Sequence, residues 1–255
     1  MNIFLVLPAY NEEASLPSLF ESCEKQVWLS PYTWRIILVN DGSLDGTVRV
    51  AQAWSKRLPI EILLHPENRG LGETIRDGLA RAAELAHPED AIVAMDADNT
   101  QPVSLIPRMI LGLEEGKDVV IASRFQPGAN VLGLNPFRRF LTLCARLLYA
   151  AVLPIPDVRD YTCGFRAYRA GLLQRAFRRY GDSLATERGF ACMAEILLKL
   201  AALGAIMGEV PMVLRYDQKA GPSKMGVSST IQASLKLLLR YRGERAQMAR
   251  KYSSR

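Results

Sequence analysis

Two aspartates have the residue type and spacing that most directly suggest chemistry. Asp96 and Asp98 stand two positions apart in the segment DADNTQP, directly after an apolar run that is typical of a buried strand. A bend after that strand can aim both carboxylates at one point, and hard oxygen ligands suit Mg²⁺ or Mn²⁺, which completes its shell with water and substrate phosphates. Such a metal neutralises the charge that develops on a diphosphate leaving group. Two solvated loop aspartates also arise easily by chance, so the surrounding elements must decide.

A second polar segment, PAYNEE, follows the first predicted strand. The ring of Tyr10 can pack on a base while Glu12 accepts hydrogen bonds from ribose hydroxyls. Alternatively, Asn11 caps the next helix, and Glu12 and Glu13 interact favourably with the N-terminal dipole of that helix. The two interpretations are compatible, and the segment is a candidate nucleotide contact.

The segment NDGSLDGT follows the second predicted strand. Asp41 ends that strand and can accept a hydrogen bond from a base, whereas Asp45 lies in a glycine-containing turn and is expected to be structural. The glycines of residues 70–74, GLGET, lack the spacing of a P-loop or a dinucleotide-binding fingerprint. They predict the start of a closely packed helix.

The elements that must position these segments follow an α/β pattern. Short apolar runs predict strands at 3–7, 36–39, 60–64, 92–95 and 119–122. Spaced apolar residues between them predict helices at 12–28, 47–55, 72–86 and 103–113. This alternation indicates a mainly parallel, twisted sheet flanked by helices, in which the carboxyl ends of the strands form the ligand site. The polar segments after the first, second and fourth strands therefore converge on one predicted site.

The second half of the chain predicts a different arrangement. Residues 137–152 place apolar side chains on one helical stripe and leave arginines outside it. A further apolar helix at 190–203 precedes a predicted hairpin around Pro211. Residues 219–226, KAGPSKMG, indicate a mobile loop.

Composition fits one catalytic domain with a small appendage. The chain has 255 residues, of which 49% are hydrophobic, enough for one large core. We expect a catalytic domain at 1–228 and a basic amphipathic C-terminal helix and tail at 229–255.

No apolar run is long enough to span a bilayer, and four cysteines without a C-x-x-C pair favour a reducing, cytoplasmic location. His65 and His87 stand beside prolines and are expected at solvated loop edges.

The formal charge of +6 and the isoelectric point near 9.2 favour an anionic partner. The acidic strand ends would repel a nucleic acid, so we expect no nucleic-acid binding. A sugar nucleotidyltransferase would carry a glycine-rich basic loop after the first strand, where this chain has PAYNEE. Phosphorylated substrates and an anionic membrane face remain as partners, and the sequence indicates no oligomeric state.

The ordered set of motifs resembles a known family. PAYNE, NDGSLDGT, NRGLGET, DADNTQP, ASRF, RDYTCGFRAY and GPSKM, in this order over about residues 1–226, are similar to the family-two glycosyltransferases of GT-A fold, in particular the dolichyl-phosphate mannosyltransferase-like branch. The resemblance implies contacts with a nucleotide sugar or its metal from Pro8, Tyr10, Glu12, Val39, Asp41, Asp96, Ala97 and Asp98. It also implies that Arg124 and Lys224 bind phosphates.

The sequence departs from this family at several positions. Asn40 replaces the first acid of the usual DDGS. The family often carries a metal-binding glutamine two residues after the second aspartate, where this chain has Thr100 followed by Gln101, so the third ligand beside Asp96 and Asp98 is Gln101 or Thr100. A family arginine is replaced by Gln218, and Lys219 or Arg215 can supply its charge.

The resemblance also implies a polyprenyl phosphate acceptor and a GDP-mannose or UDP-glucose donor. A phosphate monoester is already ionised at neutral pH, so it needs cations, and not a general base. Arg138 and Thr142 match positions where the family holds the acceptor phosphate, and direct attack on the anomeric carbon inverts it. Asp98 with its metal would stabilise the leaving diphosphate. The helix at 137–152 and the basic tail can rest on an anionic bilayer, or the apolar stripe is core.

A hydroxyl on a soluble acceptor is the alternative substrate, and it needs a carboxylate base. Asp160 and Glu195 are the candidates, because apolar neighbours can raise the pKa of a carboxyl group. Asp160 is the better placed of the two. Each can instead be paired with an arginine, for which the sequence offers Arg166, Arg169 and Arg188.

Overall fold

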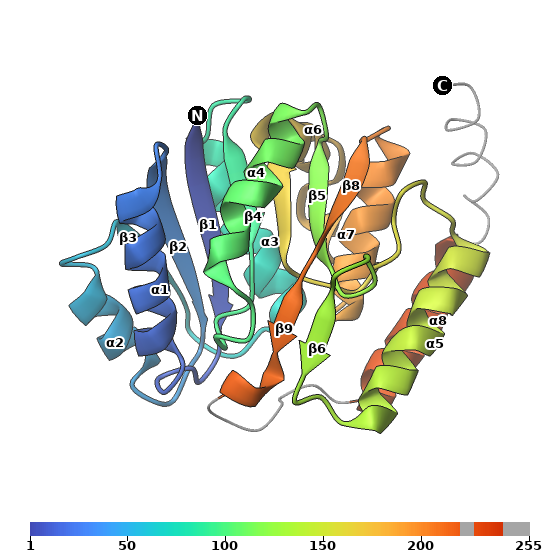
Figure 1. Ribbon diagram of the computed structural model, residues 1–255, viewed down its shortest axis with the longest axis horizontal. Helices are drawn as coiled ribbons and strands as arrows, with labels where there is room; N and C mark the ends of the chain where they lie inside the picture. The colour runs from blue at the N-terminus through green and yellow to red at the C-terminus, as the bar shows by residue number, and fades with distance from the viewer. Residues whose placement is uncertain (220–226, 242–255) are drawn as a thin grey trace.

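The computed structural model describes residues 1–219 and 227–241. Its centre is a seven-stranded sheet covered by helices on both faces (Figure 1). The strands of this sheet are β1 (Asn2–Ala9), β2 (Thr33–Asp41), β3 (Ile60–His65), β4 (Ala91–Ala94), β5 (Val119–Ser123), β7 (Arg166–Arg169) and β8 (Met207–Pro211). A separate two-stranded sheet pairs β6 (Asn130–Leu132) with β9 (Val213–Arg215).

Helices cover the large sheet in two layers. Figure 1 shows α1 and α4 over one face and α3, α6 and α7 over the other. The α-helices are α1 (Leu16–Leu29), α2 (Thr47–Trp54), α3 (Leu71–Leu85), α4 (Ile106–Glu114), α5 (Pro136–Val152), α6 (Ala170–Tyr180), α7 (Ala191–Ala202) and α8 (Val227–Tyr241). Short 3₁₀ turns are η1 (Val103–Leu105), η2 (Gly181–Leu184) and η3 (Tyr216–Gln218). Because both faces are covered, the central strands are apolar along their whole length.

The strand order is β3-β2-β1-β4-β7-β5-β8. β1 pairs in parallel with β2 and β4, whereas β7 is antiparallel to both β4 and β5. The other six strands therefore point the same way and end at one edge of the sheet. The chain winds outward from β1 to β3 and then returns to the other side of β1, so a topological switch point lies between β1 and β4.

The mainly parallel sheet is confirmed, and all strands predicted for the first half are present as β1 to β5. The predicted hairpin around Pro211 is wrong, because β8 pairs with β5 in the large sheet and β9 pairs with β6 in the small one. β7 and α6 were not predicted from the sequence. Both lie within residues 166–180, where basic residues interrupt the apolar pattern.

Helix α5 turns its apolar side away from the protein. Most large apolar side chains of the predicted stripe are exposed, namely Phe137, Phe140, Leu147 and Leu148, and so is Leu143 beside them, whereas Leu141 of the stripe is half-buried. The half-buried or buried side of α5 instead carries Arg138, Thr142, Arg146 and Tyr149, among smaller apolar residues. The interpretation of this stripe as core is therefore wrong. In the described part of the chain, no helix has the length and apolar character needed to cross a bilayer.

Helix α8 lies beside α7 and close to α5. Burial raises the pKa of Tyr149 on α5. A hydrogen bond with the Ser234 hydroxyl of α8 partly offsets this shift, so the two side chains lie close together. Leu237 and Leu238 face inward, whereas Ile231, Leu235 and Leu239 form an exposed row at four-residue spacing. The rest of the predicted basic tail, 242–255, lies outside the described residues.

Candidate active site

Loops from neighbouring strands meet at the carboxyl edge of the large sheet. Residues 10–13 follow β1, residues 42–46 follow β2, residues 95–101 follow β4 and Arg124 follows β5. The polar strand ends predict this edge as the site, and the β1–β4 switch point lies within it. These segments form the candidate active site.

Asp96 and Asp98 are each held by a residue that follows them. Gln101 makes two hydrogen bonds to Asp96: its Oε1 accepts from the Asp96 backbone N–H at 2.9 Å, and its Nε2 donates to Oδ2 at 2.8 Å. The backbone N–H and hydroxyl of Thr100 donate to Asp98 Oδ1, at 3.2 and 2.7 Å. Asn99 turns the chain with a φ of 60°, a conformation that asparagine tolerates. The bend expected from the sequence is therefore built into this loop.

A lysine neutralises Asp98. The Lys219 ammonium donates to Asp98 Oδ2 at 2.5 Å, and both side chains are largely buried. Of the two cations considered in place of the family arginine at Gln218, the structure brings Lys219 to the aspartates. Arg215 is instead paired with Asp217 at 2.8 Å.

Among the described residues, none forms an ion pair with the second carboxylate, Asp96. Burial, followed by the negative charge of Asp98, raises the pKa of Asp96 to about 7. Within the described residues, Gln101 donates to Oδ2 and no donor reaches Oδ1. A divalent cation at this position would satisfy that oxygen and offset the repulsion between the two carboxylates. The residues therefore fit Mg²⁺ or Mn²⁺.

The described residues include no group of three histidine, cysteine or acidic side chains that could hold a metal. Thr100 and Gln101, the two candidates for a third ligand, each already orient an aspartate through a hydrogen bond. Two carboxylates with water and substrate phosphates are a coordination mode that Mg²⁺ commonly uses. Water would complete the coordination shell in the absence of substrate, and substrate phosphates would replace part of that water.

Arg124 forms a buried two-point ion pair with Asp160. Its Nε donates to Oδ2 at 2.8 Å and its Nη2 to Oδ1 at 2.6 Å, while its backbone N–H donates to Oδ2 at 3.0 Å. Burial raises the pKa of Asp160, but the charge and hydrogen bonds of Arg124 outweigh it and the net shift is downward. The raised pKa is therefore wrong for Asp160, and the alternative, pairing with an arginine, is confirmed, although the partner is Arg124 and not one of the three arginines considered. A carboxylate in this state is a poor general base.

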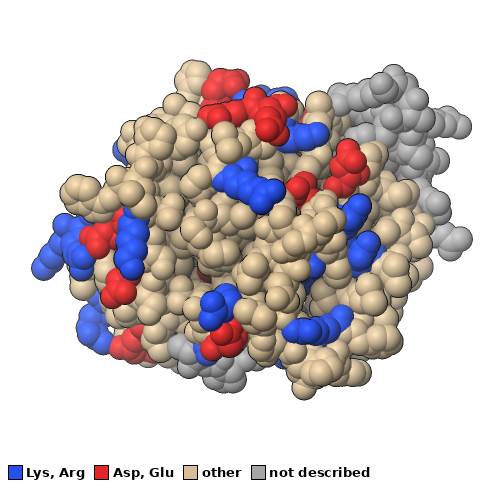
Figure 2. Space-filling view, in the orientation of Figure 1, with Lys and Arg blue, Asp and Glu red and all other residues tan. Residues whose placement is uncertain are grey.

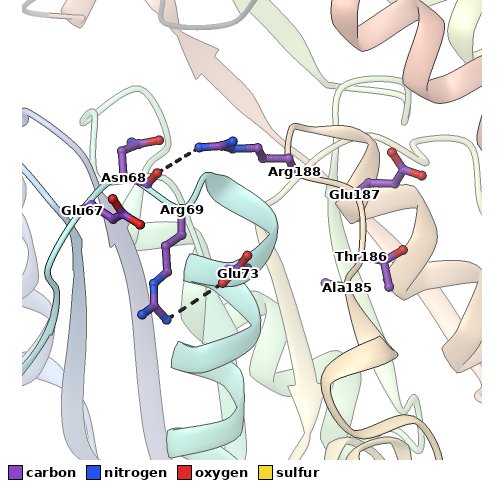
Figure 3. A pocket seen from close by; sticks show the side chains of 8 residues that line it. All are labelled: Glu67, Asn68, Arg69, Glu73, Ala185, Thr186, Glu187 and Arg188. Atoms are coloured by element: carbon purple, nitrogen blue, oxygen red, sulfur yellow. Dashed lines mark hydrogen bonds and ion pairs between the residues drawn. The ribbon is translucent and has the colours of Figure 1, made fainter.

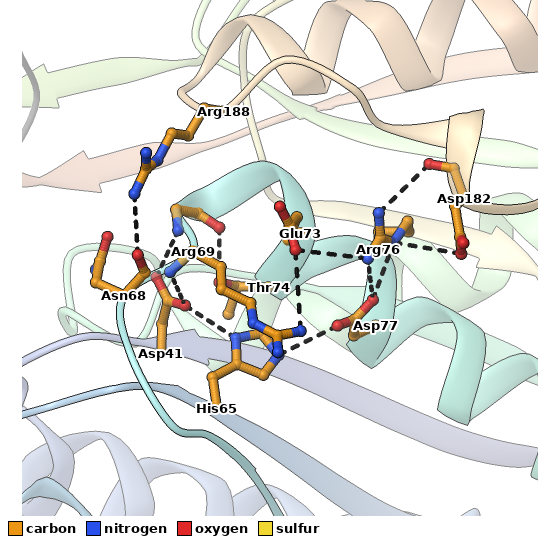
Figure 4. Close-up of polar contacts among 11 residues, drawn as sticks. Asp41, His65, Asn68, Arg69, Glu73, Thr74, Arg76, Asp77, Asp182 and Arg188 are labelled. Atoms are coloured by element: carbon orange, nitrogen blue, oxygen red, sulfur yellow. Dashed lines mark hydrogen bonds and ion pairs between the residues drawn. The ribbon is translucent and has the colours of Figure 1, made fainter.

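Asp41 is buried and both of its oxygens are occupied (Figure 4). Oδ1 accepts from the Arg69 backbone N–H at 2.9 Å and lies 2.9 Å from His65 Nδ1, and Oδ2 accepts from the Gly70 backbone N–H at 2.9 Å. Burial raises the pKa of Asp41, but these hydrogen bonds lower it overall. The other ring nitrogen of His65 lies 3.2 Å from Asp77. The expectation of a solvated His65 is wrong, because the residue is 8% exposed between two carboxylates.

The loops after β1 and β2 are joined to each other. The Asn11 backbone N–H donates to Ser43 Oγ at 2.9 Å, and Asn11 Oδ1 accepts from the Leu44 backbone N–H at 2.8 Å. Asn11 has a φ of 52° and lies before the N-terminus of α1, so the prediction that it caps the helix is wrong. Asp45 accepts from the Thr47 backbone N–H at 3.0 Å, in agreement with its expected structural role.

The remaining candidate nucleotide contacts differ in accessibility. The half-buried ones are Pro8, Tyr10 and Glu12. Val39 and Ala97 are buried. The Val39 side chain packs against α3, where a Cβ at Gly78 would lie 2.9 Å from its Cγ2, so Val39 can contact a ligand only through its main chain.

The inner side of α5 carries two arginines, one of which contacts the segment after β5. Arg146 places its guanidinium 4.8 Å from the centroid of the Phe125 ring, next to Arg124. Arg138 is half-buried two turns earlier on the helix. Lys224, the other predicted phosphate contact, lies outside the described residues.

A hollow of about 350 Å³ adjoins the site (Figure 3). One side of the hollow is the loop between β3 and α3 with the first turn of α3, and the other side is the segment before α7. Its lining residues are Glu67, Asn68, Arg69, Glu73, Ala185, Thr186, Glu187 and Arg188. The place of residues 185–188 in the site could not be predicted from the sequence, because this short segment follows no strand and carries no motif of its own.

Known structures define the class of fold. Glucosyl-3-phosphoglycerate synthase from Mycobacterium tuberculosis, solved with Mn²⁺, uridine-diphosphate and glucosyl-3-phosphoglycerate, superposes with a TM-score of 0.64 at 22% identity, over 94% of this chain and 79% of that chain. The fold is therefore a GT-A-like α/β fold, as the sequence resemblance implies. The family model described as Glycosyl transferase family 2 matches residues 4–177. The chain belongs to glycosyl transferase family 2.

Curated relatives lie in the branch that the motifs resemble. The dolichol-phosphate mannosyltransferase of Pyrococcus furiosus is 30% identical over 200 residues, which are 78% of this chain and 53% of that protein. The undecaprenyl-phosphate mannosyltransferase of Micrococcus luteus is 29% identical over 226 residues, 88% of each chain. This chain thus spans about half of the first relative and most of the second.

Proposed function

We propose that this protein is an inverting, metal-dependent hexosyltransferase that moves a sugar from a nucleoside diphosphate sugar to a polyprenyl phosphate. Family membership supports the reaction class, and the names of the two relatives support the acceptor class. GDP-mannose and UDP-glucose both remain candidate donors. The metal, Mg²⁺ or Mn²⁺, would neutralise the diphosphate leaving group.

The roles of the residues follow from their places at the sheet edge. Asp96 and Asp98 would hold the metal, with Gln101 and Thr100 orienting them. The nucleoside would lie against the loop after β1, at Pro8, Tyr10, Glu12 and the Ala97 main chain. Asp41 would act indirectly, by fixing the loop at 69–70 beside the base. Arg124 and Lys219 would supply positive charge to the phosphates.

The acceptor phosphate would act as the nucleophile. One of its oxygens forms a bond to the anomeric carbon as the bond from that carbon to the diphosphate breaks, and the electron pair leaves on the diphosphate. Attack from the opposite face inverts the anomeric centre. Because the acceptor is already ionised, no protein group has to remove a proton.

The orientation of helix α5, with its apolar side turned to solvent, is the observation that most supports a polyprenyl phosphate acceptor. Its inner side carries Arg138 and Arg146, which would bind a phosphate, while its outer side is apolar, where a polyprenyl chain would find a hydrocarbon environment. A soluble hydroxyl acceptor would need neither feature and would need a base. Asp160 and Glu195, the two candidates for that base, both have lowered pKa values.

The outer sides of α5 and α8 would rest on an anionic bilayer. Neither helix contains an acidic residue, and the flank where Figure 1 places α5 shows no red side chain in Figure 2. Exposed phenylalanine and leucine side chains would enter the interface, and each nearby lysine or arginine would add about 1 kcal/mol of attraction. Peripheral attachment of this kind would be released by salt and would not need detergent.

The first experiment is transfer from a panel of GDP- and UDP-sugars, with Mn²⁺ or Mg²⁺, with and without a short polyprenyl phosphate. We expect turnover that needs the lipid phosphate and disappears in Asp98→Asn but persists in the matched control Asp157→Asn, since Asp157 is exposed. Donor binding without transfer to the lipid would refute the acceptor assignment.

A second experiment separates the two sides of α5. Arg146→Gln should raise the KM for a short, soluble polyprenyl phosphate about tenfold, the effect of losing one hydrogen bond to a charged group. Arg139→Gln, on the exposed side of the same helix, should leave that KM unchanged while weakening flotation with anionic vesicles. Equal effects of the two variants on KM would contradict the inward phosphate site.

A further inference from the structure

A buried carboxylate on α7 connects α8 to the loop that lines the hollow. Glu195 is 0% exposed within a helix whose residues from Ala191 to Ala201 are all buried. Its Oε2 accepts from the backbone N–H groups of Thr186 and Glu187, at 2.7 and 3.0 Å, and its Oε1 accepts from the Thr186 hydroxyl at 2.7 Å. The backbone of the lining segment is therefore bonded to a group that belongs to the core.

Two cations neutralise this carboxylate, and they come from different elements. Lys199, one turn further along α7, donates to Glu195 Oε1 at 2.6 Å. Arg240, on α8, donates to the same oxygen at 2.6 Å. Burial raises the pKa of Glu195, but the hydrogen bonds from Lys199, Thr186 and Glu187 lower it overall. Arg240 thus links α8 directly to the group that holds residues 186 and 187.

The lining segment is in turn packed against the loop that Asp41 fixes. The Arg188 guanidinium donates to the Asn68 carbonyl at 2.9 Å (Figures 3 and 4). The Arg188 carbonyl accepts from the Gly72 backbone N–H at 3.2 Å. The approach is so close that a Cβ at Gly72 would lie 2.0 Å from the Glu187 carbonyl oxygen. A shift of 186–188 toward α3 would therefore move the loop beside the site, because the two backbones are in close contact and joined by these hydrogen bonds.

We infer that Glu195 is a positioning residue, and that Arg240 makes the placement of the lining segment, and with it the active-site loop, depend on how α8 is seated. The path runs from α8 through Arg240 and Glu195 to residues 186–188, and then across the hollow to residues 68–72 and Asp41. If α8 rests on a bilayer, which is part of the proposed function, contact with the lipid surface is transmitted to the site along these contacts. Such a path is a physical network of hydrogen bonds and packed backbone.

The test compares two charge-removing variants of α8. Arg240→Gln removes the bond to Glu195, whereas Lys236→Gln removes the same charge one turn away on an exposed side chain. Amide hydrogen exchange at Thr186 and Glu187 should become about tenfold faster in Arg240→Gln, as expected for one lost hydrogen bond to a charged group, and stay unchanged in Lys236→Gln. Arg240→Lys should restore part of the protection. Unchanged exchange in Arg240→Gln, or equal acceleration in both variants, would overturn the assignment.

The same variants test the link to function. In wild-type protein, vesicles of anionic lipid should slow exchange at Thr186 and Glu187 further, and in Arg240→Gln they should not. Arg240→Gln should also lower kcat for transfer while the KM for the donor stays within twofold. Vesicle-independent exchange in the wild type would refute the bilayer coupling. The exchange measurement needs neither donor nor acceptor, so an error in the proposed reaction would leave it interpretable.

Discussion

Replacing Asp160 by asparagine should destabilise the fold far more than its position in a loop suggests. The Arg124–Asp160 pair joins side chains that are 16% and 0% exposed, with contacts at 2.6 and 2.8 Å. Removing one partner of a buried pair costs roughly 3–5 kcal/mol, because the other charge stays buried without compensation. Asparagine keeps one carbonyl oxygen for the Arg124 donors, so we expect a loss of about 3 kcal/mol in the free energy of unfolding at neutral pH.

Urea unfolding followed by tryptophan fluorescence measures this loss, with Asp157→Asn as the exposed control from the same segment. The pKa of Asp160 is lowered in the folded state, so the contribution of its charge is fully present above the unfolded pKa of about 3.9 and is lost as the pH falls through the folded value. The difference between wild type and Asp160→Asn should therefore persist from pH 7 to about pH 4 and shrink below it. A loss under about 1 kcal/mol, or a difference independent of pH, would refute the reasoning.

Three further predictions concern the aspartate pair and the packing of α3. Because a metal needs the ionised carboxylate and the pKa of Asp96 is about 7, Mn²⁺ affinity should be constant above that pH and fall about tenfold per unit below it; flat affinity in a titration would contradict this. Lys219→Met should tighten Mn²⁺ binding in the absence of donor, by about tenfold or more, because it removes a charge 2.5 Å from Asp98; weaker binding would refute the competition. Gly78→Ala should cost roughly 1–3 kcal/mol, since its Cβ would lie 2.5 and 2.9 Å from valine side chains of β1 and β2, whereas Gly189→Ala, with open space around it, should cost far less in thermal unfolding.

The elements that sequence alone predicts well are those whose burial is uniform. β1, β2 and β4 are covered on both faces, so each appears as a continuous apolar run. β7 is equally buried but contains Arg166, whose guanidinium donates to the carbonyls of Met193 and Tyr161 at 2.6 and 2.8 Å. A strand that buries an arginine does not have the apolar composition of a buried strand, and so β7 was missed.

The candidate site divides in the same way. Asp96 and Asp98 were found because two carboxylates that follow a buried strand are visible in one short segment. The pairing of Arg124 with Asp160 joins residues 36 positions apart, and it depends on how the loop after α5 folds back over β5. The local sequence around either residue does not indicate that the loop brings them together. The orientation of α5 was likewise undetermined, because an amphipathic pattern defines two faces but not which one turns inward.

The antiparallel strand β7 has a consequence for the order in which the protein can fold. The first hundred or so residues contain β1 to β4, which can pair with one another as soon as these residues are available. β7 lies between β4 and β5 in the sheet, so Ala91 of β4 can pair with Arg169 of β7 only after the chain has reached that residue. Closure of the sheet is therefore a late, non-local step that requires most of the chain, a kind of step that slows folding and exposes unpaired strand edges in the meantime. Asp96 and Arg124 follow the two strands on either side of this closing strand. A ligand that contacts both residues would stabilise the closed sheet, and the effect would grow with ligand concentration. The substrate would therefore also protect the protein against separation of β7 from its two neighbouring strands.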